Sequence, residues 1–138
     1  MEDVRSILSQ FRGKSVKQQE VQNPGDQSPT LSSIPDIFFD VILPKYKISR
    51  IEIIVLMFLY RQIWSKTNLN RKYGIGPINS FKDMSAYLMV EQKDVIDAIH
   101  SLERYGLIQT VRVGQYFVRK FFTEDFDLKY GQSYDEFF

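Results

Sequence analysis

Cysteine is absent from this chain of 138 residues, and histidine occurs once, as His100. The lack of cysteine excludes disulfides, thiolate metal sites and a cysteine nucleophile. One histidine without cysteine also cannot form a conventional zinc site. We therefore expect no metal and no cofactor, and a chain without cysteine fits most easily in the cytoplasm.

Long apolar runs are missing as well. The longest, Ile51–Tyr60, is interrupted by Glu52 and ends at Arg61, so it falls short of the roughly 20 residues that span a bilayer. The first ten residues have no basic region followed by an apolar stretch, so we expect no secretory signal. The sequence therefore predicts a protein that does not interact with membranes.

Arrangements typical of catalysis are missing too. Asp94 and Asp97 lie one helical turn apart, a spacing more typical of a solvated helix face than of an acid–base pair. The segment Gly74-Ile75-Gly76-Pro77 lacks the strand-to-helix context of a phosphate-binding loop, so we interpret it as a turn. No nucleophile–base arrangement is visible, and we predict that the protein is not an enzyme.

Charge is plentiful but unevenly distributed. Residues 1–40 carry four basic and six acidic groups, residues 41–122 carry thirteen and six, and residues 123–138 carry one and five. The middle segment is therefore near +7 and lies between two acidic ends. A basic domain is expected of a nucleic-acid binder, although a solvated surface with excess lysine has the same composition.

The termini are predicted to be flexible and the middle to fold. Residues 2–12 place four apolar side chains on one face of a short amphipathic helix, and residues 13–33 read as a polar linker. We expect a flexible segment over residues 1–32, a folded domain over 33–122 and an acidic, aromatic tail over 123–138.

Helix signals recur through residues 33–64. Ser33 and Pro35 mark a first helix start, Ile37, Phe38, Val41 and Ile42 form its apolar face, and Pro44 is expected to end it. The run Ser49-Arg50-Ile51-Glu52 is a capping box, with Ile48 and Ile53 at the positions of a hydrophobic staple. A long helix is predicted from there to about Trp64.

The second half predicts two short helices and a hairpin. One helix begins after Ser80, and a tight turn at Met89–Glu91 leads to the helix Gln92–Tyr105, which Gly106 ends in a left-handed conformation. Two β-rich runs, Leu107–Val113 and Tyr116–Phe122, flank Gly114-Gln115 and read as a hairpin. Two helices across a tight turn form a helix-turn-helix unit. We therefore predict an α+β fold, mostly α: a winged helix-turn-helix whose wing is the hairpin.

Three segments carry a family resemblance: SIPDIFFDVI, KISRIEIIVLMFLYRQIW and INSFKDMSAYLMVEQKDVIDAIHSLERYGLI. They resemble the amino-terminal winged-helix domain of bacteriophage replication protein O and related replication initiators. More loosely, they are similar to many winged-helix transcription regulators. The resemblance covers residues 33–110 and implies a DNA-binding protein that acts in replication initiation or transcription regulation. The chain departs from the family at the tight turn, where the family usually has a glycine and then a Ser or Thr cap.

The predicted reading helix shows a second departure, because it carries four acids (Glu91, Asp94, Asp97, Glu103) against two bases (Lys93, Arg104). It can supply selectivity, since Gln pairs with adenine and Lys with guanine, but phosphate attraction has to come from elsewhere. The candidate contacts to duplex DNA are Gln92, Lys93, Asp94, Asp97, His100, Ser101 and Arg104 on this helix, Arg71 and Lys72 in the loop, and Arg112, Gln115, Arg119 and Lys120 in the wing.

The alternative is a non-catalytic adaptor that uses the same fold to bind a protein partner. The acidic helix favours this hypothesis, as do the amphipathic N-terminal segment and the tail, in which aromatic residues alternate with acids. The tail could equally pack on its own domain, and a homodimer is left open. The candidate partner contacts are Val4, Ile7, Leu8, Phe11, Phe126, Tyr130, Tyr134 and Phe137.

Overall fold

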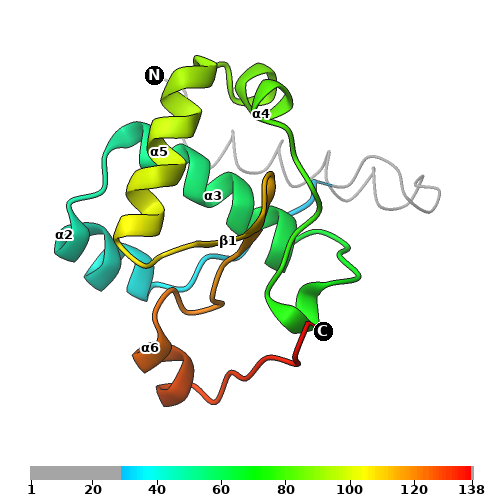
Figure 1. Cartoon of the computed structure of the whole chain (residues 1–138). Coiled ribbons are helices and arrows are strands. Elements are labelled where there is room, and N and C mark those ends of the chain that lie inside the picture. The colour runs from blue at the N-terminus through cyan, green and yellow to red at the C-terminus, as the bar shows by residue number, and fades with distance from the viewer. Residues whose placement is uncertain (1–28, 138) are drawn as a thin grey trace, which may run out of the picture. The chain divides into compact units, whose positions relative to one another are not determined.

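The computed structural model describes residues 29–137. The expected helix over residues 2–12, with the candidate partner contacts Val4, Ile7, Leu8 and Phe11, lies outside the described residues. A compact unit begins at Ser32 and includes the described C-terminal residues. The described part is mostly helical with one two-stranded antiparallel sheet, which confirms the predicted α+β, mostly α class (Figure 1). In chain order its elements are η1 (Phe38–Ile42), α2 (Leu43–Tyr46), α3 (Arg50–Trp64), η2 (Arg71–Tyr73), α4 (Phe81–Leu88), α5 (Gln92–Arg104), β1 (Gln109–Arg112), β2 (Gln115–Phe117) and α6 (Glu124–Lys129).

The prediction that Pro44 ends the first helix was wrong. The helix passes through Pro44 and ends at Lys47, which adopts a left-handed conformation with φ 50°. A regular α-helix would press the proline ring against the carbonyl one turn earlier. Here the turn before the proline is a wider π-turn, η1, in which the Leu43 N–H bonds to the Phe38 carbonyl. No side chain caps the start of η1, so Ser33 does not act as the predicted cap.

The capping box before α3 is confirmed. The Glu52 N–H donates to Ser49 Oγ at 3.3 Å, and the Ser49 N–H donates to Glu52 Oε1 at 3.0 Å. These bonds satisfy two amides that a helix start leaves without partners. The helix then runs to Trp64, as predicted, and buries one face in the core.

The helices α4 and α5 also match the sequence pattern. Ser80 caps α4 by accepting from the Asp83 N–H at 3.0 Å. The apolar stripe of α5, which has the i, i+3, i+4, i+7 spacing of one helix face, is buried, and α5 packs against both α3 and α4. The stripe consists of Val95, Ala98, Ile99 and Leu102. Gly106 ends α5 with φ 79°, and the N–H groups of Gly106 and Leu107 bond to the carbonyls of Glu103 and Leu102. This pair of bonds is a Schellman motif, so the predicted left-handed glycine is confirmed.

The hairpin is shorter than predicted. Strand pairing covers Gln109–Arg112 and Gln115–Phe117, and Ile75 bridges to Phe117 on the other side of β2. After Phe117 the chain no longer pairs with β1: the Val118 N–H bonds to the Gly74 carbonyl, and side chains from α3 bond to the carbonyls that follow. Trp64 Nε1 donates to the Val118 carbonyl at 3.1 Å, and Tyr60 Oη donates to the Lys120 carbonyl at 2.7 Å.

The glycines at the two ends of the hairpin should respond differently to alanine. A Cβ on Gly106 would meet nothing within 4 Å, so Gly106→Ala carries only the cost of the left-handed backbone, about 1–2 kcal/mol. A Cβ on Gly114, which has φ +85°, would lie 2.4 Å from the Asn79 carbonyl oxygen. Urea unfolding should therefore show a larger loss for Gly114→Ala than for Gly106→Ala.

Gly106→Val should lower the melting temperature further than Gly106→Ala, because a β-branched side chain is the least tolerant of positive φ. An unchanged melting temperature for Gly106→Val would contradict the assignment of Gly106 as the helix-terminating residue.

Candidate nucleic-acid interface

The unit formed by α4, its turn and α5 is held by hydrogen bonds of the turn itself. Met89 takes the left-handed conformation, with φ 56°, at the position where a glycine is usual. The Val90 N–H bonds to the Ser85 carbonyl, and Ser85 Oγ donates to the Val90 carbonyl at 2.5 Å. Met89 is 91% exposed, so none of residues 29–137 packs over the outside of this turn. The turn is therefore tight although it lacks the expected glycine.

The seven candidate contacts on α5 share one helix, and the structure leaves their side chains accessible. Gln92, Lys93, Asp97, His100 and Arg104 are exposed, while Asp94 and Ser101 are half-buried. Glu91 takes the N-cap position but forms no side-chain cap hydrogen bond, so within residues 29–137 no N-cap side chain satisfies the first amides of α5. The exposed surface of α5 thus combines a positive helix end, a glutamine and a lysine with several carboxylates.

The tip of the hairpin lies against the start of α4. The Asn79 N–H donates to the Gly114 carbonyl at 2.7 Å, and the side chains of Asn79 and Gln62 form a reciprocal amide pair. Arg112 remains exposed beside this tip. Gln115 was expected at the surface, and that prediction was wrong: its side chain is 4% exposed, and its Nε2 donates to the Gly76 carbonyl at 3.0 Å.

Two of the predicted phosphate-binding arginines bond to other groups of the domain, although Arg71 is exposed and Arg119 half-buried. Arg71 donates from Nη2 to the Lys66 carbonyl and from Nε to the Ile63 carbonyl, which closes the loop after α3. Arg119 forms an ion pair with Asp127 at 3.1 Å. Lys72 and Lys120 are exposed. The segment η2, which carries Arg71 and Lys72, lies at the other end of the domain from the start of α5, beside the C-terminal end (Figure 1).

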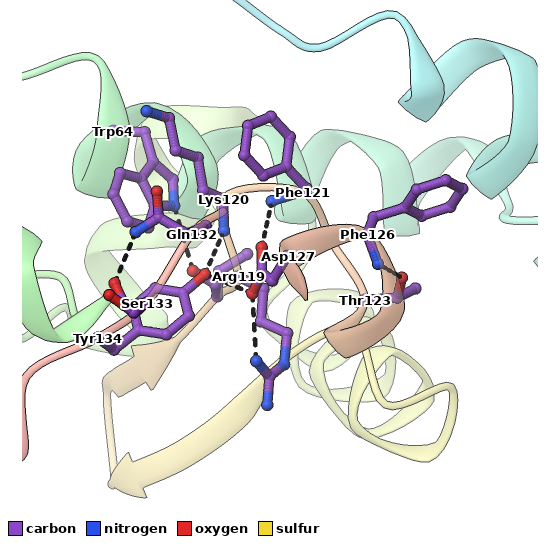
Figure 2. A network of polar contacts seen from close by, with 11 residues as sticks. Trp64, Arg119, Lys120, Phe121, Thr123, Phe126, Asp127, Gln132, Ser133 and Tyr134 are labelled. Carbon is purple, nitrogen blue, oxygen red and sulfur yellow. Dashed lines mark hydrogen bonds and ion pairs between the residues drawn. The ribbon is translucent and has the colours of Figure 1, made fainter. Parts of the chain in front are cut away.

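The C-terminal segment folds against the domain around a buried carboxylate (Figure 2). Asp127, on α6, is 2% exposed. Its Oδ2 accepts from Arg119 Nη1 at 3.1 Å and from Tyr134 Oη at 2.6 Å, and its Oδ1 accepts from the Phe121 N–H at 3.1 Å. Tyr134 Oη in turn accepts from the Lys120 N–H at 2.8 Å. Burial of a carboxylate is costly unless hydrogen bonds and an ion pair compensate for the lost water. The bonds of Asp127 and Tyr134 do so, and they also join residues 119–121 to the tail.

Sequence reasoning missed this cluster. For the tail residues, contact with a partner and packing on their own domain were both left open. The structure has the second: Tyr134 points into the domain, Phe126 packs against the core and Phe137 meets the Tyr73 ring at 5.5 Å. Tyr130 is the most exposed of the four, at 47%. One local signal was available: Thr123 caps α6 by accepting from the Phe126 N–H at 3.2 Å, so a Thr followed by acids marked a helix start.

Burial raises the pKa of the Tyr134 phenol well above its usual range, and its hydrogen bond to the Asp127 carboxylate adds to the effect. Burial likewise raises the pKa of Tyr60, with a smaller contribution from the nearby charge of Asp127. Both phenols are therefore held in their protonated form, which is the form that can donate their hydrogen bonds.

Comparison with models of known protein families, with curated protein sequences and with solved structures found no match. Among residues 29–137, no three His, Cys, Asp or Glu side chains come together as ligands for a metal ion. No helix within the same range has the length and apolar character needed to cross a membrane.

The two raised tyrosine pKa values predict a loss of stability at alkaline pH. Unfolded tyrosines ionise near pH 10, whereas the folded pKa values of Tyr60 and Tyr134 are higher. The contribution of these phenols is thus complete below about pH 10 and is lost as the pH rises above it. Urea unfolding between pH 8 and 11 should show this decline.

Tyr134→Phe should cost about 1.5–3 kcal/mol at pH 8, the range for a hydrogen bond to a charged group, and its further loss above pH 10 should be smaller than that of the unsubstituted protein. Tyr130→Phe is the matched control, because Tyr130 is exposed and its hydroxyl forms no hydrogen bond within residues 29–137. Identical pH profiles for all three proteins would contradict the assigned role of Tyr134.

Proposed function

We propose that residues 33–122 form a winged helix-turn-helix domain that binds duplex DNA. The observation that carries the proposal is the unit of α4, the Met89 turn and α5, with the first side chains of α5 exposed. Reading helices of this kind contact base edges with their N-terminal residues. The order of elements supports the wing as well, because the Ile75 bridge precedes α4 and the pair β1–β2 follows α5.

In this proposal α5 lies in the major groove, with Gln92 and Lys93 at the base edges. The phosphates would be held by exposed cations around that surface. Lys82 stands in the first turn of α4, Arg104 in the last turn of α5 and Arg112 at the tip of the hairpin. None of them has an ion-pair partner among the described residues, so their charge is available to phosphates. The protein would then act in the cytoplasm as a transcription regulator or a replication-initiation factor.

The decisive measurement is fluorescence anisotropy with a labelled duplex of mixed sequence at two salt concentrations. Binding should be detectable at low salt and weaken steeply as the salt rises, because counterions are released from the contacted phosphates. The absence of duplex binding at low salt would contradict the proposal.

Acidic residues on α5 favour a second candidate, an adaptor that binds a protein partner. Asp97 is exposed and Asp94 is half-buried in the first turns of the helix. Neither has an ion-pair partner within residues 29–137, so each would repel phosphate or attract a basic partner. An adaptor would dock a basic surface of its partner on these carboxylates.

Two substitutions should separate affinity from selectivity on DNA. Arg112→Gln should weaken binding to all duplexes alike and flatten the salt dependence, because it removes a phosphate contact. Gln92→Ala should instead reduce discrimination between sequences, by roughly 1–3 kcal/mol for a bidentate contact. Lys45→Gln, at an exposed position on α2, is the charge-matched control and should leave both quantities unchanged.

The double variant Asp94→Asn, Asp97→Asn should distinguish the two candidates. If α5 faces phosphates, removing these charges should tighten non-specific DNA binding, since two repulsive groups are lost. The adaptor hypothesis predicts no change in DNA affinity and weaker binding of a basic protein partner. Anisotropy with the same duplex at low salt measures the first outcome directly.

A further inference from the structure

The part of the surface around Tyr134 gathers aromatic rings from segments that are far apart in the sequence. The Tyr134 ring lies 5.1 Å from Phe117 of β2 and 6.1 Å from Trp64 of α3, measured between ring centroids. Tyr73 and Phe137 meet edge to face at 5.5 Å. We call this surface the tail face. It comprises the rings of Trp64, Tyr73, Phe117, Tyr134 and Phe137 and the cations that lie over them, Lys72, Arg119 and Lys120.

A cavity of about 300–1,000 Å³ is typical of a small-ligand site, and the tail face contains one of about 440 Å³. The four rings of the two edge-to-face pairs, Phe117–Tyr134 and Tyr73–Phe137, line this cavity. The side chain of Gln109, which is exposed, and the guanidinium of Arg119 add polar groups to the lining. The cavity thus offers ring surfaces for stacking and polar groups for the edge of a planar ligand.

Cations alternate with the rings on this face. Lys72 Nζ lies 5.0 Å from the Tyr73 ring centroid, and Lys120 Nζ lies 5.8 Å from that of Trp64. Both lysines are exposed and lack an ion-pair partner within residues 29–137. Arg119 lies 5.3 Å from the Phe117 ring and uses only Nη1 for Asp127, so its Nε and Nη2 have no partner in the described part of the chain.

Acidic residues near the tail face offset part of its positive charge. Asp127 is buried and committed to Arg119 and Tyr134, so it does not face a ligand. Asp135 and Glu136 are exposed, and Asp135 lines the cavity. The lysines therefore stand on a surface of alternating sign, and the acids are expected to weaken the binding of a polyanion rather than prevent it.

We propose that the tail face binds single-stranded nucleic acid, with one base stacked in the cavity and the flanking phosphates on Lys72 and Lys120. Aromatic rings interleaved with cations are the arrangement by which proteins hold unpaired bases and their backbone. A duplex does not fit this chemistry, because its bases are already stacked on each other. The tail face lies at the other end of the domain from the start of α5, so the inference does not rest on duplex binding by α5 (Figure 1).

The experiment uses the full chain and a twelve-nucleotide oligothymidylate. Trp64 is the single tryptophan of the protein, and its ring lies 6.1 Å from that of Tyr134, which lines the cavity, so its fluorescence reports on the tail face. We expect the oligonucleotide to quench Trp64 and to bind in anisotropy measurements, with a dependence on salt that reflects about two phosphate contacts. Failure to bind or to quench at low salt would overturn the proposal.

Single-residue variants test whether the oligonucleotide binds at the tail face. Lys72→Gln and Lys120→Gln should each weaken single-strand binding, and Asp135→Asn should tighten it. Tyr73→Leu keeps an apolar side chain but removes a stacking ring, and it should reduce affinity by roughly 5- to 150-fold. An unchanged melting temperature shows that each variant folds. If Tyr73→Leu does not fold, the two lysine variants decide the test, since their side chains are exposed.

Lys93→Gln, on α5, is the matched control for charge. It should leave single-strand binding unchanged and weaken duplex binding. Lys72→Gln should weaken single-strand binding and leave duplex binding unchanged. An equal loss of single-strand affinity in both variants would place the single strand on α5 and overturn the proposal. A peptide of alternating Asp and Phe is the competing ligand. If it quenches Trp64 and binds with higher affinity than the oligonucleotide, the proposal is overturned, because the tail face would then be a protein-binding surface.

Discussion

The packing of α3 against α5 is the contact on which the rest of the domain depends. Val55, Leu56 and Leu59 on α3 and the stripe of α5 are almost completely buried. Each buried side chain of this size contributes about 1.5–3 kcal/mol relative to an exposed one. Because one face of α5 is committed to α3, its other face has to point outward, and this places Gln92 and Lys93 at the surface. The exposure of the candidate reading surface is thus a consequence of the core.

A second constraint acts at the end of the hairpin. Asp127 could not be buried as a charge without partners, and it finds them in Arg119, the Phe121 N–H and Tyr134. Phe122, next to this cluster, has φ 72° and is completely buried, with its ring stacked on Tyr60 at 4.9 Å. The carboxylate and the ring together hold the chain after β2 against α3. The acidic tail is therefore part of the domain, and its residues Tyr134, Asp135 and Phe137 line the cavity on the tail face.

The charges of the domain are divided between two surfaces by this arrangement. Lys93, Arg104 and Arg112 stay near α5 and the hairpin tip, while Lys72 and Lys120 stand beside the aromatic rings of the tail face. Arg71 and Arg119 stabilise the fold. A summed charge near +7 over residues 41–122 concealed this division. It also explains why an acidic α5 can belong to a basic domain, since most of the positive charge lies on other elements.

The sequence by itself determined the features that depend on neighbours three or four residues apart. The capping box at Ser49, the cap at Ser80, the buried stripe of α5 and the left-handed Gly106 were all readable, because their bonds join residues within one helical turn. The tertiary structure alone decided the helix through Pro44, the burial of Gln115, the ion pair of Arg119 and the packing of Tyr134. These depend on distant partners: Tyr60 and Lys120 are sixty residues apart along the chain, yet the Tyr60 hydroxyl bonds to the Lys120 carbonyl. No local pattern encodes which side chain will meet a given carbonyl after folding, because that meeting is set by how the whole core packs.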